Sequence, residues 1–208
     1  MAIAYSYDGA LYLAPTRRCT LSCIFCPKVN GRWEVAGNDM SSDREPNADT
    51  LLSAALAQDP SAHREVAFVG LGEPTLRLPV VLTVGAALKR AGHHVRLVTD
   101  GLANLRFEED ITPDLAGVID EVHVSMNAPD KETYARICPS RHGACAHDAI
   151  CDFIQRVKAH VPKVVATVVA LPDLDIDACR ALADSLGVPL RIRPYFDPAT
   201  GNPHEDAS

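Results

Sequence analysis

Three cysteines stand within eight residues near the start of the chain. The C-x3-C-x2-C spacing of Cys19, Cys23 and Cys26 lets one short loop supply three thiolates, and the adjacent sequence offers no fourth cysteine. Structural zinc sites and ferredoxin clusters take four protein ligands. Three ligands around a cubane cluster leave one iron open, and an open metal position is typical of catalytic sites. The spacing therefore predicts a catalytic iron–sulfur centre, with a zinc knuckle or three reduced structural thiols as alternatives.

A polar turn follows the next apolar run. Positions 66–70 read V-A-F-V-G, which predicts a short buried strand ended by glycine, and Gly72, Glu73 and Pro74 come directly after it. A glycine at such a point lets the backbone approach a ligand closely. The carboxylate of Glu73 suits an ammonium group, and Pro74 stiffens the turn. An ordinary strand-to-helix turn is the alternative interpretation.

These two motifs together resemble those of the radical S-adenosylmethionine (radical SAM) superfamily. The resemblance lies in the C-x3-C-x-aromatic-C pattern, with Phe25 at its aromatic position, and in the Gly-Glu-Pro turn after the second predicted strand. It implies that the three cysteines hold a 4Fe–4S cluster whose open iron binds the amino and carboxylate groups of SAM. It also implies that Phe25 lies beside the nucleoside and that Gly72, Glu73 and Pro74 hold the SAM amino group.

Polar residues end two further predicted strands. Thr99 and Asp100 end the third strand, where the superfamily often carries Thr-Asn-Gly, so Asp100 replaces the usual Asn. Ser125 and Asn127 end the fourth strand, and the two-residue period of a strand predicts that both face one side. The resemblance implies that such residues hydrogen-bond the ribose and carboxylate of SAM. A strand-end Ser and a turn Asn are the ordinary alternative.

Two arginines alternate with an apolar residue in the last predicted strand. Arg191 and Arg193 flank Ile192, so both point to one side. If that side is the interior of a barrel, each guanidinium needs an anion, because an unpaired buried charge is costly. The SAM carboxylate or an acidic substrate would serve, and Arg193 is therefore a candidate cofactor-binding residue. If that side is the exterior, both arginines face solvent.

Strands and helices alternate along the chain, which predicts a parallel sheet with right-handed crossovers. The expected strands are Leu11–Ala14, Val66–Gly70, Val95–Thr99, Glu121–Met126, Val164–Leu171 and Leu190–Pro194. The expected helices are Asp49–Gln58, Pro79–Ala91, Thr112–Ala116, Asp130–Cys138, Cys145–His160 and Asp175–Leu186. Six such units fit an α/β fold of the partial (β/α)6 TIM-type barrel, the radical SAM core that the resemblance also implies. Ligands of such barrels bind at the carboxyl ends of the strands.

Length and composition bound the class of protein. The 208 residues predict a single domain, with a core at about 10–196 and a flexible tail at 197–208. The net charge of −7 makes a large surface for duplex nucleic acid unexpected. We expect no membrane span and no signal peptide. Seven cysteines, an odd number without framework spacing, indicate a reducing compartment, so we expect a cytoplasmic protein.

Four further cysteines receive no role from the sequence: Cys138, Cys145, Cys151 and Cys179. The first three are too widely spaced to suggest a second cluster, and we expect buried or free thiols. Cys145 and Cys151 are expected to share a helix, about 120° apart around its axis. Cys179 is expected to lie on a helix in the core.

Four stretches are similar to the TatD-associated radical SAM family: residues 72–75, 99–105, 124–130 and 168–172. That similarity runs from about Leu11 to Tyr195, with Asp100 as a departure from the expected Asn. The narrower family does not supply a substrate.

The resemblance implies that an electron from a flavodoxin or ferredoxin cleaves SAM to methionine and a 5′-deoxyadenosyl radical, which abstracts a substrate hydrogen. A short, open barrel suggests that the substrate closes part of the site, which favours a peptide or protein. The leading alternative is a small-molecule task such as a deazapurine-type rearrangement. Two others are a zinc-binding regulatory module and a cluster protein that only transfers electrons.

Overall fold

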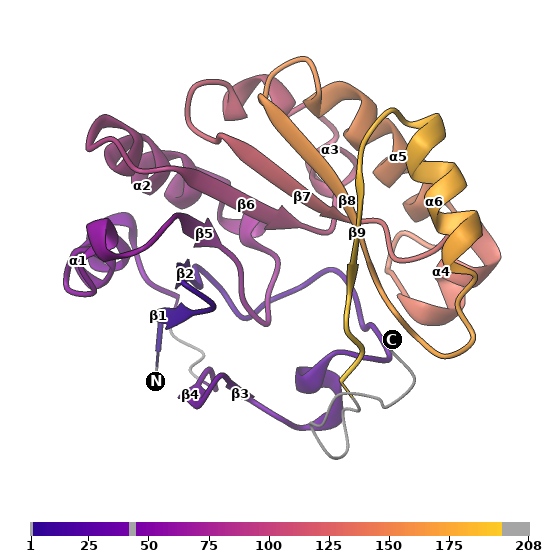
Figure 1. Cartoon of the computed structure of the whole chain (residues 1–208), viewed down its shortest axis with the longest axis horizontal. Coiled ribbons are helices and arrows are strands. Elements are labelled where there is room, and N and C mark those ends of the chain that lie inside the picture. Colours follow the sequence, from indigo (N-terminus) through magenta and orange to yellow (C-terminus); the bar gives the residue numbers. More distant parts are fainter. Residues whose placement is uncertain (1, 42–44, 197–208) are drawn as a thin grey trace.

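A seven-stranded sheet forms the centre of the computed structural model, which describes residues 2–41 and 45–196 (Figure 1). Its strand order is β1-β2-β5-β6-β7-β8-β9. Strand β1 runs antiparallel to β2, and every later neighbour pairs in parallel. The strands are β1 (Ala4–Tyr7), β2 (Ala10–Leu13), β5 (Val66–Phe68), β6 (Val95–Thr99), β7 (Glu121–Ser125), β8 (Lys163–Val169) and β9 (Leu190–Arg193).

The helices lie along the outer face of the curved sheet (Figure 1). They are α1 (Ala48–Leu56), α2 (Leu78–Arg90), α3 (Ala103–Phe107), α4 (Lys131–Ile137), α5 (Cys145–Val157) and α6 (Ile176–Ser185). Short 3-10 turns are η1 (Pro27–Asn30), η2 (Pro60–Ala62), η3 (Pro74–Arg77) and η4 (Thr112–Leu115). Strands β3 (Glu34–Val35) and β4 (Asn38–Asp39) make a small separate hairpin.

The main hydrophobic core fills the space between the sheet and these helices, and Tyr5, Ala14 and Met40 form a second, smaller cluster. Leu11, Leu13 and Phe68 of the strands are fully buried in the main core, together with Val81 of α2 and Phe153 of α5. Alternate strand residues point outward to the helices, as the two-residue period requires. The opposite face of the sheet is not covered by these helices (Figure 1).

Capping residues in the sequence begin and end several helices. The side chains of Asp130 and Asp175 accept backbone N–H groups at the starts of α4 and α6. Gly92 and Gly187 adopt positive φ values of 84° and 67°, past the ends of α2 and α6.

The six predicted strands and their parallel order are confirmed, with shifts of one or two residues at most ends. Strand β1, helix α3 and the β3–β4 hairpin were not predicted. The expected helix Thr112–Ala116 is the 3-10 turn Thr112–Leu115, because one turn is too short for an α-helix. The predicted tail at 197–208 lies outside the described residues. No described helix is long and apolar enough to cross a membrane.

Candidate active site

The predicted site residues follow the carboxyl ends of the parallel strands. The three-cysteine loop, residues 19–26, comes after β2, and Gly72, Glu73 and Pro74 come after β5. Thr99 and Asp100 lie at the end of β6, Ser125 and Asn127 at the end of β7, and Arg193 at the end of β9. We call this end of the sheet the mouth. The topology therefore brings to one end residues that lie as far apart as positions 19 and 193 in the chain.

Local hydrogen bonds shape the three-cysteine loop. The Cys26 amide donates to the Cys23 carbonyl oxygen over 3.0 Å, and the Leu21 amide donates to the Cys19 sulfur over 3.5 Å. The Asn30 side chain donates to the carbonyl oxygens of Ile24 and Cys26. All three cysteines are half-buried and free of disulfides. The loop is thus held by its own hydrogen bonds, and its three thiols are free.

The Gly-Glu-Pro turn packs directly on the chain that leads into the cysteine loop. A Cβ at Gly72 would lie 2.3 Å from the Thr16 carbonyl oxygen and 2.7 Å from that of Arg18. The Glu73 amide donates to the Arg18 carbonyl oxygen over 2.7 Å. Gly72 therefore permits a close approach of two backbone segments, whereas the sequence suggested an approach to a ligand. Pro74 is buried and starts η3.

The Glu73 carboxylate is buried and accepts four hydrogen bonds. Its Oε1 accepts from the Thr75 amide, the Thr75 hydroxyl and the Thr99 hydroxyl over 2.9, 2.6 and 2.8 Å. Its Oε2 accepts from the Asp100 amide over 2.7 Å. Burial first, and the negative charge of Asp100 second, raise the pKa of Glu73 to about 8. A carboxylate oxygen has two lone pairs, so Oε2 has the capacity for one acceptor position besides that used by the Asp100 amide.

Asp100 joins this turn to the cysteine loop. Its Oδ2 accepts the Thr20 hydroxyl, and its Oδ1 accepts the Leu102 amide over 2.9 Å. Asp100 is 5% exposed, and burial raises its pKa. Two carboxyl groups therefore lie together at the mouth, an arrangement that favours a nearby cation.

The cysteine sulfurs share this negative surrounding. Burial, with the charges of Asp100 and Glu73, raises the pKa of Cys19 to about 12. The Cys138 side chain hydrogen-bonds Cys23 and, with burial, raises its pKa also. A metal cation binds the thiolate form, so it would offset this charge and displace the thiol protons.

Asn127 does not follow the strand period assumed from the sequence. Strand β7 ends at Ser125, and Asn127 is in the left-handed region at φ 57°, so the alternation of β7 does not orient it. The Asn127 amide donates to the Thr167 carbonyl oxygen of β8 over 3.1 Å. Its side-chain Nδ2 donates to the Cys138 sulfur over 3.5 Å. Asn127 is buried, whereas Ser125 is partly exposed.

Arg193 faces the interior side of the sheet. It is half-buried, burial and Arg191 lower its pKa, and Cys23, Cys138 and Tyr12 act against that change. The interior alternative for this arginine is the one that the structure shows. Phe25 is half-buried and packs against the core.

Several buried polar atoms at the mouth have no hydrogen-bond partner. Among the described residues these are Asn127 Oδ1, Tyr134 OH, His142 Nε2, Thr167 Oγ1 and Arg193 Nε. Buried polar atoms in native proteins almost always have hydrogen-bond partners, so several unpaired ones at one place indicate that a polar ligand binds there. Such a setting fits a cluster held by three thiols together with a polar nucleotide. Thr167, Tyr134 and His142 were missed in the sequence, because only the fold brings them to the cysteines.

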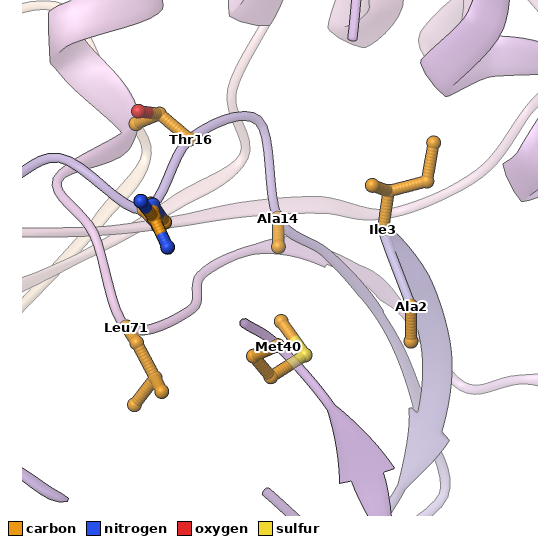
Figure 2. Close-up of a pocket in the computed structure, with 7 residues that line it drawn as sticks. Ala2, Ile3, Ala14, Thr16, Met40 and Leu71 are labelled. Carbon is orange, nitrogen blue, oxygen red and sulfur yellow. The ribbon is translucent and has the colours of Figure 1, made fainter. Parts of the chain in front are cut away.

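A small hollow beside the mouth is not the expected cofactor site. It holds about 20 Å³ and is lined mainly by apolar side chains of the segments that precede β1 and follow β2, β4 and β5, among them Ala14, Met40 and Leu71 (Figure 2). Such a volume suits about one water molecule. It is far too small for a nucleotide.

Comparisons with known proteins agree with this architecture. The family description "Radical SAM superfamily" matches residues 13–186. No curated protein matches the chain. A radical SAM methyltransferase from Sphaerobacter thermophilus has a similar structure, with a TM-score of 0.69 at 15% identity over 93% of this chain and 58% of that one.

Two further solved structures are similar. Streptococcus suis SuiB bound to precursor peptide SuiA gives a TM-score of 0.65 at 14% identity, over 92% of this chain and 40% of that one. The methyltransferase TsrM from Kitasatospora setae, with tryptophan and a SAM analogue bound, gives 0.54 at 9% identity, over 89% and 36%. At such low identities, these TM-scores show a shared fold and nothing more. The chain spans between 36% and 58% of the length of the three structures.

Proposed function

This chain belongs to the radical SAM superfamily, and on that premise we propose that it binds one 4Fe–4S cluster and SAM and cleaves SAM reductively for hydrogen abstraction from a substrate. The superfamily uses this pair of cofactors. The observation that carries the proposal is the convergence of three free thiols from one loop with orphaned buried polar atoms at the mouth.

The residues of this chain have distinct proposed roles. Cys19, Cys23 and Cys26 hold three irons. When bound, the cluster and SAM supply the electron transfer and the radical. Glu73 offers the second acceptor position of Oε2 to the SAM ammonium group, and Thr99 holds the Glu73 carboxylate in place. Gly72 and Pro74 fix the turn.

The remaining candidates bind the other parts of SAM. We assign Ser125 and Asn127 to the ribose and carboxylate, because the Asn127 Oδ1 atom is buried without a partner. Arg193 neutralises the SAM carboxylate or an acidic substrate group. Phe25 lies against the nucleoside. Asp100 supports Glu73 and keeps the mouth negative, which favours the sulfonium.

A peptide or protein is our proposed substrate class. Both β1 and β9 are edge strands, so the barrel stays open on the side between them. The structurally similar SuiB was solved with a precursor peptide. A flavodoxin or ferredoxin is the proposed electron donor. The four stretches resembling the TatD-associated family favour that narrower membership.

The experiment is anaerobic reconstitution with iron and sulfide, followed by reduction in the presence of SAM. We expect about four irons per chain and release of 5′-deoxyadenosine. Cys23→Ala should abolish both, whereas Cys145→Ala, which removes an exposed cysteine on α5, should change neither. SAM cleavage that persisted in Cys23→Ala would remove the ligand assignment, and colourless protein with one zinc would favour the regulatory module. Stimulation of SAM turnover by small metabolites and not by peptides would favour the small-molecule alternative.

A further inference from the structure

The segment 137–140 at the end of α4 lies antiparallel to the cysteine loop. The Ile24 amide donates to the Ile137 carbonyl oxygen over 3.0 Å, and the Ser22 amide donates to that of Pro139 over 2.9 Å. Leu21 and Ser140 form an antiparallel bridge. This register places Cys138 directly opposite Cys23. The two cysteines lie between hydrogen-bonded pairs, which is the narrow position of an antiparallel ladder, with Cα atoms typically about 4.5 Å apart.

The hydrogen bonds around Cys138 have a definite direction. Asn127 Nδ2 donates to the Cys138 sulfur over 3.5 Å, so that sulfur is already an acceptor. The Cys138 side chain is fully buried and hydrogen-bonds Cys23. A Cys23 sulfur that ligates iron carries no proton and can only accept. The Cys138 S–H group is then the donor, and Asn127 orients it.

Tyr134 supplies an independent observation, one turn earlier on α4. Its side chain is 1% exposed, and its hydroxyl has no hydrogen-bond partner. Burial raises the pKa of Tyr134, and so do the nearby charges of Cys138, Asp100, Cys23 and Cys19. Tyr134 therefore lies within electrostatic range of two proposed ligands, Cys23 and Cys19. A buried hydroxyl donor without an acceptor indicates an acceptor that binds there.

We propose that Cys138 and Tyr134 are positioning residues that donate hydrogen bonds to the Cys23 sulfur and to the sulfur atoms of the cluster, and so set its reduction potential. This inference rests on the proposed function, since it requires a cluster at the three cysteines. Reduction adds negative charge to the sulfurs, so each donor stabilises the reduced form more than the oxidised form. Hydrogen bonds to sulfur are among the factors that set such potentials.

The test is an EPR-monitored redox titration of the anaerobically reconstituted full chain without SAM. We expect Cys138→Ala and Tyr134→Phe each to keep the wild-type iron content and to lower the midpoint potential. Cys138→Ser keeps a hydroxyl donor at the same position and should restore the potential towards the wild-type value. Cys179→Ala is the matched control, because it removes another fully buried thiol, on α6, and should leave the potential unchanged.

Two results would overturn the inference while leaving the proposed function standing. One is that the wild type assembles a cluster and that Cys138→Ala and Tyr134→Phe both have the same midpoint potential as the wild type. The other concerns the effect of SAM on the EPR spectrum. If SAM left the wild-type spectrum unchanged but altered that of Cys138→Ala, Cys138 would be a fourth ligand of the cluster. Wild-type protein that assembles no cluster would instead contradict the proposed function itself.

Discussion

Buried polar groups are paired with one another at one end of the parallel sheet, whereas several are unpaired at the other end. At the amino end, Glu65, Arg96, Glu121 and His123 form a linked group that we call the floor cluster. Arg96 donates to both oxygens of Glu65 over 2.9 and 3.0 Å, and His123 Nε2 lies 2.5 Å from Glu121 Oε1. At the mouth, by contrast, five described residues carry buried polar atoms without partners.

The floor cluster fixes the state of its histidine. Arg96 Nη1 lies 3.4 Å from His123 Nδ1, and an arginine can only donate, so Nδ1 must accept. Nε2 then carries the proton and donates to Glu121. His123 is therefore neutral, in agreement with burial lowering its pKa to about 4. Every member of the floor cluster thus has a complementary partner.

The difference separates structural from ligand-binding polarity. Glu65, His94 and Glu121 also place three possible metal-ligand atoms within 4.8 Å of one another. However, the oxygens of Glu65 already accept Arg96, and those of Glu121 face His123, Lys163 and His94. The carboxylates of the floor cluster are therefore already paired with protein groups. The unpaired polar atoms at the mouth would gain hydrogen-bond partners only when a polar ligand binds there.

The largest expected effect comes from breaking the floor cluster. Arg96→Met should lower the free energy of unfolding by about 3–5 kcal/mol, because it leaves a carboxylate of 12% side-chain exposure with only the longer 3.6 Å ion pair to the exposed Arg64. Urea unfolding at pH 7 measures this loss. Joint replacement of Glu65 and Arg96 by Met should recover most of it.

Thr167→Val is the matched change at the mouth. It removes a buried hydroxyl that has no partner, so the unfolding free energy should change by less than about 1 kcal/mol or should increase. A loss in Thr167→Val as large as that in Arg96→Met would erase the distinction between the two ends of the sheet.

A smaller effect is expected from the paired carboxyl groups of the mouth. Asp100 and Glu73 have raised pKa values, about 8 for Glu73, so the folded protein holds protons that the unfolded chain has released above its ordinary value of 4.5. Stability should therefore fall as the pH rises from about 4.5 to about 8. Asp100→Asn removes one charge, while its Oδ1 can still accept the Leu102 amide. We expect it to be more stable than the wild type by on the order of 2 kcal/mol at pH 8.5.

The pH dependence of that difference is the measurement. Urea unfolding at pH 5.5, 7.0 and 8.5 should show the two proteins diverging as the pH rises. Parallel curves for Asp100→Asn and the wild type would show that the carboxyl groups do not share a proton in the folded state.

The sequence predicted the elements better than the contacts. Alternating apolar runs located all six parallel strands, and the asymmetric spacing of Cys19, Cys23 and Cys26 located the loop. Strand β1 was not predicted because it is a short edge strand that pairs only with β2, in antiparallel orientation. Cys138 received no role, since its position opposite Cys23 depends on how α4 ends against the loop. Long-range pairing of this kind leaves no period or motif in a single sequence.

The second pH-dependent effect concerns His123, and its sign is opposite to that of the carboxyl groups at the mouth. Its pKa is lowered from 6.5 to about 4, so the unfolded chain takes up a proton below about pH 6.5 that the folded protein does not. Stability should therefore fall as the pH drops from about 6.5 to about 4. His123→Gln keeps a donor for Glu121 and an acceptor for Arg96 but cannot titrate. At pH 5 we expect its loss of unfolding free energy, relative to pH 7, to be about 1–2 kcal/mol smaller than that of the wild type. Equal losses in both proteins would mean that His123 is already charged in the folded protein. The floor cluster would then contain a second cation beside Arg96, instead of a neutral imidazole that accepts from Arg96 and donates to Glu121.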